Sequence, residues 1–128
     1  MLHGSCLCGK ARYRVEDAFR YALNCHCGQC RRATGSAFKA FAGIERSKLH
    51  IARETSLMLF GLEDQNHDAR CRTCGSLLYS VVRSGEYVHV TLGTLIDPPS
   101  LLPTAHIFVG SKASWYEILD SLPQHSEF

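Results

Sequence analysis

The chain has 128 residues, of which 45% are hydrophobic and 20% charged, and its formal net charge at pH 7 is +2. This length indicates one domain over residues 1–128, and the apolar content excludes a disordered chain. No segment approaches the roughly 20 apolar residues of a membrane span, and no export signal or long basic run is present, so we expect a cytoplasmic protein without membrane or nucleic-acid partners.

The first half of the chain alternates short apolar segments with turns, which is the pattern of β-strands. Residues 11–15 alternate small or apolar side chains with arginine, and residues 21–27 form a second expected strand. Residues 28–33 are compatible with one helical turn, which Gly35 would end. Further strands are expected at residues 38–42, 50–51 and 57–60, with a turn around residues 44–48.

The second half predicts a hairpin with strands at residues 77–82 and 87–92 around Ser84-Gly85. Pro98-Pro99 interrupts the pattern, and residues 106–109 resume it. Residues 122–128 are polar, which indicates a loosely ordered tail. Because no long helical pattern is present, we predict an all-β domain with at most a helical turn or two.

Seven cysteines fall into three clusters, which is the most informative feature of the sequence. Tetrahedral zinc takes four nitrogen or sulfur ligands, and each cluster can supply two or three of them from one short turn. The alternative of disulfides is weaker, because the number is odd and the expected compartment is reducing. The clusters are Cys6 and Cys8; Cys25, Cys27 and Cys30; and Cys71 and Cys74.

Two cysteine pairs far apart in sequence most often close one structural site. We therefore assign Cys6, Cys8, Cys71 and Cys74 to a closed four-thiolate zinc site, which contributes on the order of 10 kcal/mol to folding. Gly75 fits this assignment, since glycine permits positive φ after the second ligand of such a turn. Joining the middle cluster to one outer pair would leave the other pair without a site.

The remaining cysteines, Cys25, Cys27 and Cys30, predict a second zinc with an open coordination position. Side-chain alternation places Cys25 and Cys27 on one side of an extended segment and directs His26 away from it. The fourth ligand would be water, a substrate, or a distant histidine such as His89 or His106.

Three thiolates make the second zinc a weak Lewis acid, which argues against a hydrolase. A soft, sulfur-rich site suits a thiol substrate that binds as thiolate. Arg31, Arg32 and Lys39 follow the cluster in sequence. They would either offset its negative charge or remain solvated surface charges.

The motifs resemble those of the glutathione-dependent formaldehyde-activating enzyme family, whose relatives include centromere protein V. The resemblance implies several short coiled β-sheets organised by two zinc ions, and carbon–sulfur lyase chemistry on glutathione and formaldehyde. It also implies that Cys25, Cys27 and Cys30 are catalytic and the other four cysteines structural. In that reaction a zinc-held glutathione thiolate attacks formaldehyde and gives S-(hydroxymethyl)glutathione. The matching segments are residues 4–9, 25–36, 71–75, 106–109 and 111–115.

The leading hypothesis is therefore a zinc-dependent carbon–sulfur lyase that uses a small thiol such as glutathione. Two alternatives are a zinc-organised binding module and a thiol redox sensor, because labile zinc leaves oxidisable thiolates. His106 lies in the late motif, outside any cysteine cluster. It is either a catalytic pocket residue that gives a proton to the adduct oxygen or a histidine hydrogen-bonded within a strand.

Overall fold

The computed structural model describes residues 1–128, which form mostly β-strands and one short α-helix, as the all-β prediction requires. The helix α1 (Gly28–Thr34) has seven residues, and no helix is long and apolar enough to cross a membrane. The strands are β1 (Leu2–Ser5), β2 (Arg12–Val15), β3 (Tyr21–Cys25), β4 (Lys39–Glu45), β5 (Leu49–Ile51), β6 (Leu57–Gly61), β7 (His67–Cys71), β8 (Leu77–Val82), β9 (Tyr87–Thr91) and β10 (His106–Ile107).

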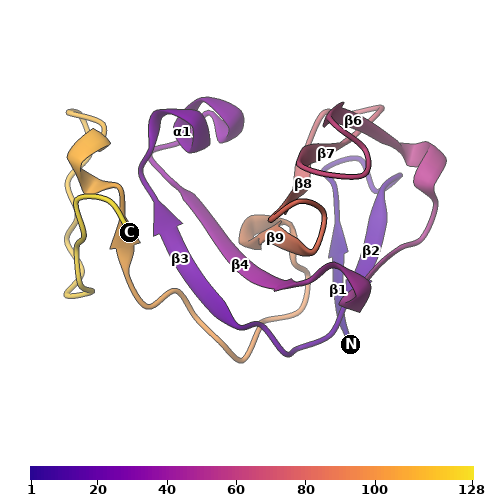
Figure 1. The fold of residues 1–128 in the computed structure, drawn as a ribbon, viewed down its shortest axis with the longest axis horizontal. Helices are drawn as coiled ribbons and strands as arrows, with labels where there is room; N and C mark the ends of the chain where they lie inside the picture. Colours follow the sequence, from indigo (N-terminus) through magenta and orange to yellow (C-terminus); the bar gives the residue numbers. More distant parts are fainter.

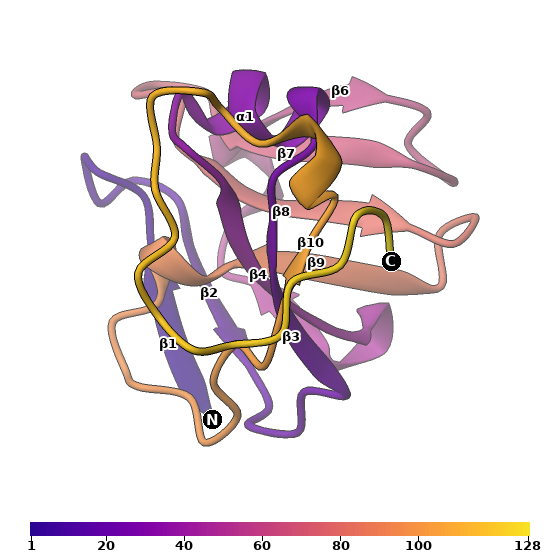
Figure 2. The ribbon, with the colours of Figure 1, turned by 90° about the vertical axis from the view of Figure 1, so that its left-hand side faces the viewer.

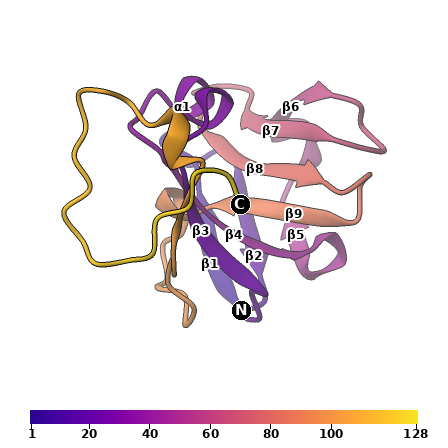
Figure 3. The same ribbon diagram turned by 60° about the vertical axis from the view of Figure 1, so that its left-hand side comes forward.

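The strands form two sheets (Figure 1). The smaller sheet has three strands in the order β1-β2-β5, and the larger has seven in the order β10-β3-β4-β9-β8-β7-β6. Figure 3 shows β6 to β9 side by side in the order in which they pair. All neighbours are antiparallel except β10, which runs parallel to β3.

The hydrophobic core lies between the small sheet and one face of the large sheet. Tyr13 and Val15 of β2 belong to the same buried cluster as Ile44, Val88 and Val90 of β4 and β9. Because side chains alternate along a strand, the residues between these core positions point to the opposite face of the large sheet. That second face carries the polar and aromatic groups described below.

The predicted strands are present in the structure, but several of them begin or end at other residues than expected. The strand expected at residues 21–27 ends at Cys25, because the chain turns there into α1. The turn expected around residues 44–48 was wrong at its start. Ile44 is fully buried in β4, which pairs with strands on both sides and so continues to Glu45. Strands β1 and β7 were not predicted.

The loosely ordered tail expected at residues 122–128 was also wrong. This segment runs beside β10 and pairs with its backbone, so it continues the edge of the large sheet (Figure 2). The His125 N–H donates to the His106 carbonyl at 2.9 Å, and the His106 N–H donates to the Pro123 carbonyl at 2.9 Å. The polar composition hid this pairing, because main-chain hydrogen bonds do not depend on side-chain character.

Candidate functional site

Four cysteines meet where the loop after β1 approaches the turn after β7. The sulfur atoms of Cys6, Cys8, Cys71 and Cys74 all lie within 4.8 Å of one another. The Cys6 and Cys8 sulfurs are 3.6 Å apart, and those of Cys8 and Cys71 are 3.8 Å apart. A tetrahedral zinc with bonds of about 2.3 Å requires sulfur–sulfur distances of roughly 3.8 Å. The cluster could therefore hold a zinc ion.

The backbone around this cluster has the form of two ligand-bearing turns. The Ala11 N–H donates to the Cys6 sulfur at 3.3 Å, and the Cys74 N–H donates to the Cys71 sulfur at 3.4 Å. Gly75 has a φ of +80°, as the sequence predicted for the residue after the second ligand. Such N–H groups stabilise sulfur in its anionic form, which is the form that binds metal.

The second cluster sits at the junction of β3 and α1. Cys25 ends the strand, Cys27 caps the helix and Cys30 lies in its first turn. The Cys30 N–H donates to the Cys27 sulfur at 3.3 Å. The three sulfurs lie within 4.8 Å of one another, and no histidine nitrogen belongs to this group. The cluster could therefore hold a metal with one position left for an external ligand.

The Cys25 and Cys30 thiols do not ionise together. Hydrogen bonding from the Cys30 thiol lowers the pKa of Cys25 to about 6, and the Cys27 thiol adds to this effect. The same interaction, with burial, raises the pKa of Cys30. A group of thiols that interact this strongly ionises fully only when a cation joins it.

A buried lysine accompanies the three-cysteine cluster. Lys39 in β4 is only 6% exposed, and Cys25 is its partner in the ladder with β3. The Lys39 ammonium donates to the Ser80 hydroxyl at 3.0 Å, and that hydroxyl donates to the Asp68 carboxylate at 2.6 Å. Burial lowers the pKa of Lys39, whereas the charges of Cys30 and Asp68 act in the opposite direction. Of the cations considered from the sequence, Lys39 is thus the buried one.

His26 and His106 lie apart from the sulfurs and bond to each other. His26 Nε2 is 2.8 Å from His106 Nδ1, and His106 Nε2 is 2.9 Å from an Asp120 carboxylate oxygen. Since the carboxylate can only accept, His106 donates from Nε2, and a neutral His106 then accepts at Nδ1 from His26 Nε2. Burial, with the His106 charge second, lowers the pKa of His26 to about 4, so its ring is neutral at pH 7.

Both ring nitrogens of His106 are therefore occupied, and its partner in β3 is Asn24 rather than Cys25. His106 lines neither the Phe41 cavity nor the larger cavity on the small sheet, which are described below, and its catalytic role stays a prediction. Its contact with the cluster runs through His26, which lies between Cys25 and Cys27 in the chain. Through this hydrogen bond, His106 can fix the position of the segment that carries Cys25, Cys27 and Cys30.

His89 lies in β9 on the second face of the large sheet. Its Nε2 is 2.7 Å from the Tyr21 hydroxyl oxygen, and its ring stacks on Phe41 with centroids 4.2 Å apart. Burial, followed by the charges of Lys39 and Arg83, lowers the pKa of His89 to about 4. The ring is therefore neutral at pH 7, and it is not part of either sulfur group.

A cavity of about 290 Å³ opens beside this histidine, and we call it the Phe41 cavity. His89 and Arg83 contribute its two polar or charged side chains besides the Tyr21 hydroxyl. Its apolar and aromatic lining consists of Tyr21, Leu23, Phe41, Val82, Ile107 and Phe128.

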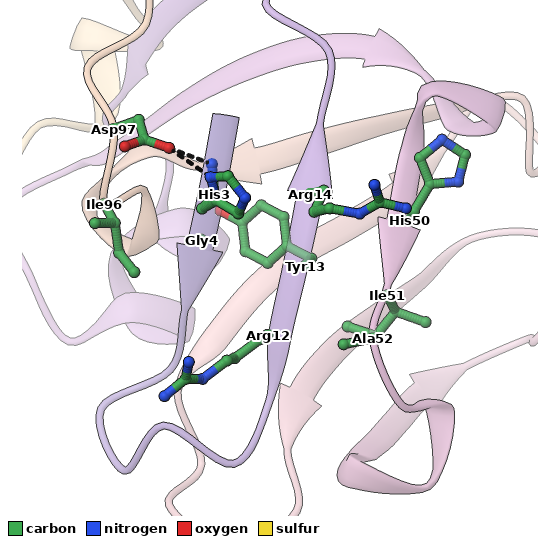
Figure 4. Close-up of a pocket in the computed structure, with 10 residues that line it drawn as sticks. All are labelled: His3, Gly4, Arg12, Tyr13, Arg14, His50, Ile51, Ala52, Ile96 and Asp97. Carbon is green, nitrogen blue, oxygen red and sulfur yellow. Dashed lines mark hydrogen bonds and ion pairs between the residues drawn. The ribbon is translucent and has the colours of Figure 1, made fainter. Parts of the chain in front are cut away.

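A larger cavity of about 630 Å³ lies on the small sheet (Figure 4). On one side, His3 bonds to the Asp97 carboxylate through its backbone N–H at 2.7 Å and its ring Nδ1 at 2.9 Å. Arg12 and Arg14 of β2 project from the middle strand (Figure 4). No cysteine lines this cavity, and none of its lining residues belongs to the apolar group around Cys25.

Sequence reasoning missed several residues of the site. Asp68, Ser80 and Asp120 were not singled out, and Tyr21 was treated only as part of a strand. Ser80 carried a weak signal, because it interrupts the apolar run of β8. The others have no local signal, since their roles depend on partners 12 to 68 residues away.

Comparison with known proteins gives consistent matches. The model of the family described as glutathione-dependent formaldehyde-activating enzyme matches residues 1–111. A Halomonas elongata protein named "Putative glutathione-dependent formaldehyde-activating enzyme" is 30% identical over 127 residues, which cover 92% of this chain and 81% of that protein. The crystal structure of a Rhodobacter sphaeroides protein is similar, with a TM-score of 0.61 and 29% identity over 77% of this chain and 91% of that one.

Proposed function

Since the chain belongs to the glutathione-dependent formaldehyde-activating enzyme family, we propose that it is a zinc-dependent carbon–sulfur lyase. Its reaction forms or cleaves the adduct of a small thiol and an aldehyde, such as S-(hydroxymethyl)glutathione. The observation that carries this proposal is the group of three sulfurs, from Cys25, Cys27 and Cys30, that has no fourth side-chain ligand.

The two sulfur groups suit two different roles for zinc. Cys6, Cys8, Cys71 and Cys74 supply a complete set of four ligands, which is typical of a structural site. Cys25, Cys27 and Cys30 supply three and leave room for a substrate atom. Zinc bound there would hold a substrate thiol as its thiolate, which is the nucleophilic form.

Lys39 makes the second site more favourable for anions. Three thiolates and a thiolate substrate carry two more negative charges than a Zn²⁺ ion neutralises. The buried Lys39 ammonium interacts with the charges of Cys25 and Cys30, and Ser80 and Asp68 hold it in place. Because the group is buried, this attraction is stronger than it would be in water.

The reaction needs no oxidant or reductant. In the forward direction a carbon–sulfur bond forms as the carbonyl π bond breaks, the thiol loses one proton and the carbonyl oxygen gains one. The reverse direction returns the proton to the sulfur side and releases the aldehyde. The protein therefore has to hold the sulfur, orient the carbonyl and exchange one proton.

Calorimetric titration with glutathione tests the proposal. We expect saturable binding to the zinc-loaded protein, and at least a tenfold weaker affinity in Cys27→Ser, which removes one of the three sulfurs. S-methylglutathione is the matched ligand control, since it lacks the thiol and should not bind in the same range. Equal binding of both ligands, or unchanged affinity in Cys27→Ser, would contradict a thiol site at this cluster.

A rate measurement accompanies the titration. Formation of S-(hydroxymethyl)glutathione from glutathione and formaldehyde is followed by exchange NMR with and without the protein. The lyase proposal requires an acceleration that Cys27→Ser abolishes. A protein that binds glutathione without accelerating exchange would be a thiol-binding module instead.

A further inference from the structure

The Phe41 cavity shares part of its wall with the apolar group around Cys25, although no cysteine lines the cavity itself. Phe41 and Ile107 line the cavity, and both pack with Cys25 in one buried apolar group. In the ladder between β3 and β4, Leu23 pairs with Phe41 and the next pair on the same face is Cys25 with Lys39. The cavity therefore begins one residue pair from a proposed zinc ligand.

The size of the cavity exceeds what formaldehyde needs. Formaldehyde adds only one carbon and one oxygen to a thiol, whereas a cavity of roughly 150 Å³ suffices for benzene. The Phe41 cavity has about 290 Å³. It therefore has room for a six-membered ring and a short linker.

The lining does not suit glutathione itself. Glutathione carries two carboxylates, an ammonium and two amide groups, each of which requires a hydrogen-bond partner when buried. The cavity offers no acidic or amide side chain, and its one permanent charge, Arg83, is exposed and lies over the Tyr87 ring at 4.4 Å. Its occupant should therefore be mainly apolar.

One polar pair interrupts the apolar lining. Tyr21 and His89 share a hydrogen bond of 2.7 Å and both line the cavity. A neutral imidazole has one donor and one acceptor nitrogen, and the phenol can donate or accept, so the pair can exchange a proton with a hydroxyl. The pair can therefore hydrogen-bond a polar atom of a molecule that occupies the cavity.

We propose that the Phe41 cavity holds the organic substituent of an aldehyde larger than formaldehyde, so that the substrates are thiol adducts of apolar or aromatic aldehydes. This inference rests on the proposed lyase function and narrows its substrate class. The reaction is the same addition: the carbon–sulfur bond forms, the carbonyl π bond breaks, and the proton lost by the thiol is balanced by the one gained at oxygen.

Filling the cavity tests this proposal. Leu23→Trp places a large ring in the cavity, and Leu59→Trp makes the same change on the exposed strand β6 as a control. Exchange rates with glutathione are measured for benzaldehyde and for formaldehyde. We expect the unmodified protein to favour benzaldehyde in kcat/KM. Leu23→Trp should reduce the benzaldehyde to formaldehyde ratio on the order of tenfold, a typical effect of closing an apolar pocket, while Leu59→Trp leaves it unchanged.

A binding measurement covers the case in which Leu23→Trp folds poorly. Benzyl alcohol, which resembles the aldehyde-derived half of the adduct, is titrated into the unmodified zinc-loaded protein and followed by NMR. The proposal requires changes in the NMR chemical shifts of Phe41, His89 and Ile107. Chemical-shift changes confined to other residues would overturn it. A higher kcat/KM for formaldehyde that neither tryptophan variant alters would also overturn it. Absence of activity with every aldehyde would instead contradict the lyase function. The benzyl alcohol titration would then test by itself whether the cavity binds an aromatic substituent.

Discussion

Lys39 and Cys25 lie directly opposite each other in the ladder between β3 and β4. Opposite residues of an antiparallel pair project on the same face, so a buried ammonium accompanies the sulfur that ends β3. Lys39 is held from the other side by Ser80, which itself donates to Asp68. The charge of the three-cysteine site therefore depends on residues of four strands, β3, β4, β7 and β8, and not only on the segment that carries the cysteines.

Replacing Lys39 should therefore weaken the second zinc site. Lys39→Met keeps most of the length of the side chain and removes its charge, so we expect roughly tenfold lower zinc affinity at this site, equivalent to about 1.4 kcal/mol. Competition with a chelator measures it. Lys48→Met is the control, because Lys48 lies in the turn after β4 and pairs with Glu45 at 3.7 Å. Equal zinc affinity in both variants would show that Lys39 has no electrostatic role.

Cys71→Ser should destabilise the whole domain. Cys71 is buried and ends β7, and its sulfur completes the four-cysteine group. Loss of one ligand sacrifices much of the metal contribution to folding, so we expect a thermal midpoint lower by roughly 10 °C or more. Cys27→Ser is the comparison and should lose the second zinc while keeping most of the midpoint. If both variants unfold alike, the division into structural and catalytic sites is incorrect.

Asp120 should control the proton positions on His106 and His26. In Asp120→Asn the side-chain amide can donate to His106 Nε2, which would push a proton to Nδ1 and then to the unpaired, buried Nδ1 of His26. We expect a lower unfolding free energy, because His106 loses its hydrogen bond to a charged acceptor. Nitrogen-15 NMR of the rings reports the tautomers. Unchanged ring signals would contradict the assigned hydrogen-bond chain.

His106→Gln separates positioning from catalysis. If His106 acts only through His26, activity with glutathione and formaldehyde should fall by about tenfold or less, and Asp120→Asn should cause a similar loss. A fall on the order of 10²-fold with zinc retained, seen in His106→Gln alone, is the signature of a general acid and would contradict the positioning role.

His89 should make stability depend on pH. Its pKa is lowered to about 4 in the folded protein, from about 6.5 in an unfolded chain. Between these values only the unfolded state binds the proton, so unfolding free energy falls as pH decreases from about 6.5 to about 4, with no further loss below. The groups that face His89 are the Tyr21 hydroxyl, Lys39, Arg83, Tyr87 and Ser80.

Chemical denaturation of His89→Gln measures this contribution. Glutamine does not titrate, so the stability difference between the variant and the unmodified protein should change across this pH window and stay constant above pH 7. Zinc release in acid affects both proteins and cancels in the comparison. A constant difference from pH 7 to pH 4 would show that folding does not lower the pKa of His89.

The sequence by itself determined the features that are local. Short spacings brought Cys25, Cys27 and Cys30 into one group, glycine after Cys74 fixed the turn, and the alternation in residues 77–82 and 87–92 identified the central hairpin. It also separated four cysteines from three, because zinc requires four ligands and short turns supply them in sets. The first three inferences succeed because each depends on a few neighbouring residues, and the last because the number of ligands in each cluster leaves one complete way to combine them.

Only the tertiary structure decided what surrounds the three-cysteine group. Lys39 meets Ser80, Tyr21 meets His89, and Asp120 meets His106 only after strands pair in a particular order and register. A shift of one residue in any strand would turn these side chains to the opposite face. Composition and periodicity do not specify that order, so the buried lysine, the Phe41 cavity and the paired C-terminal segment emerge only from the folded chain.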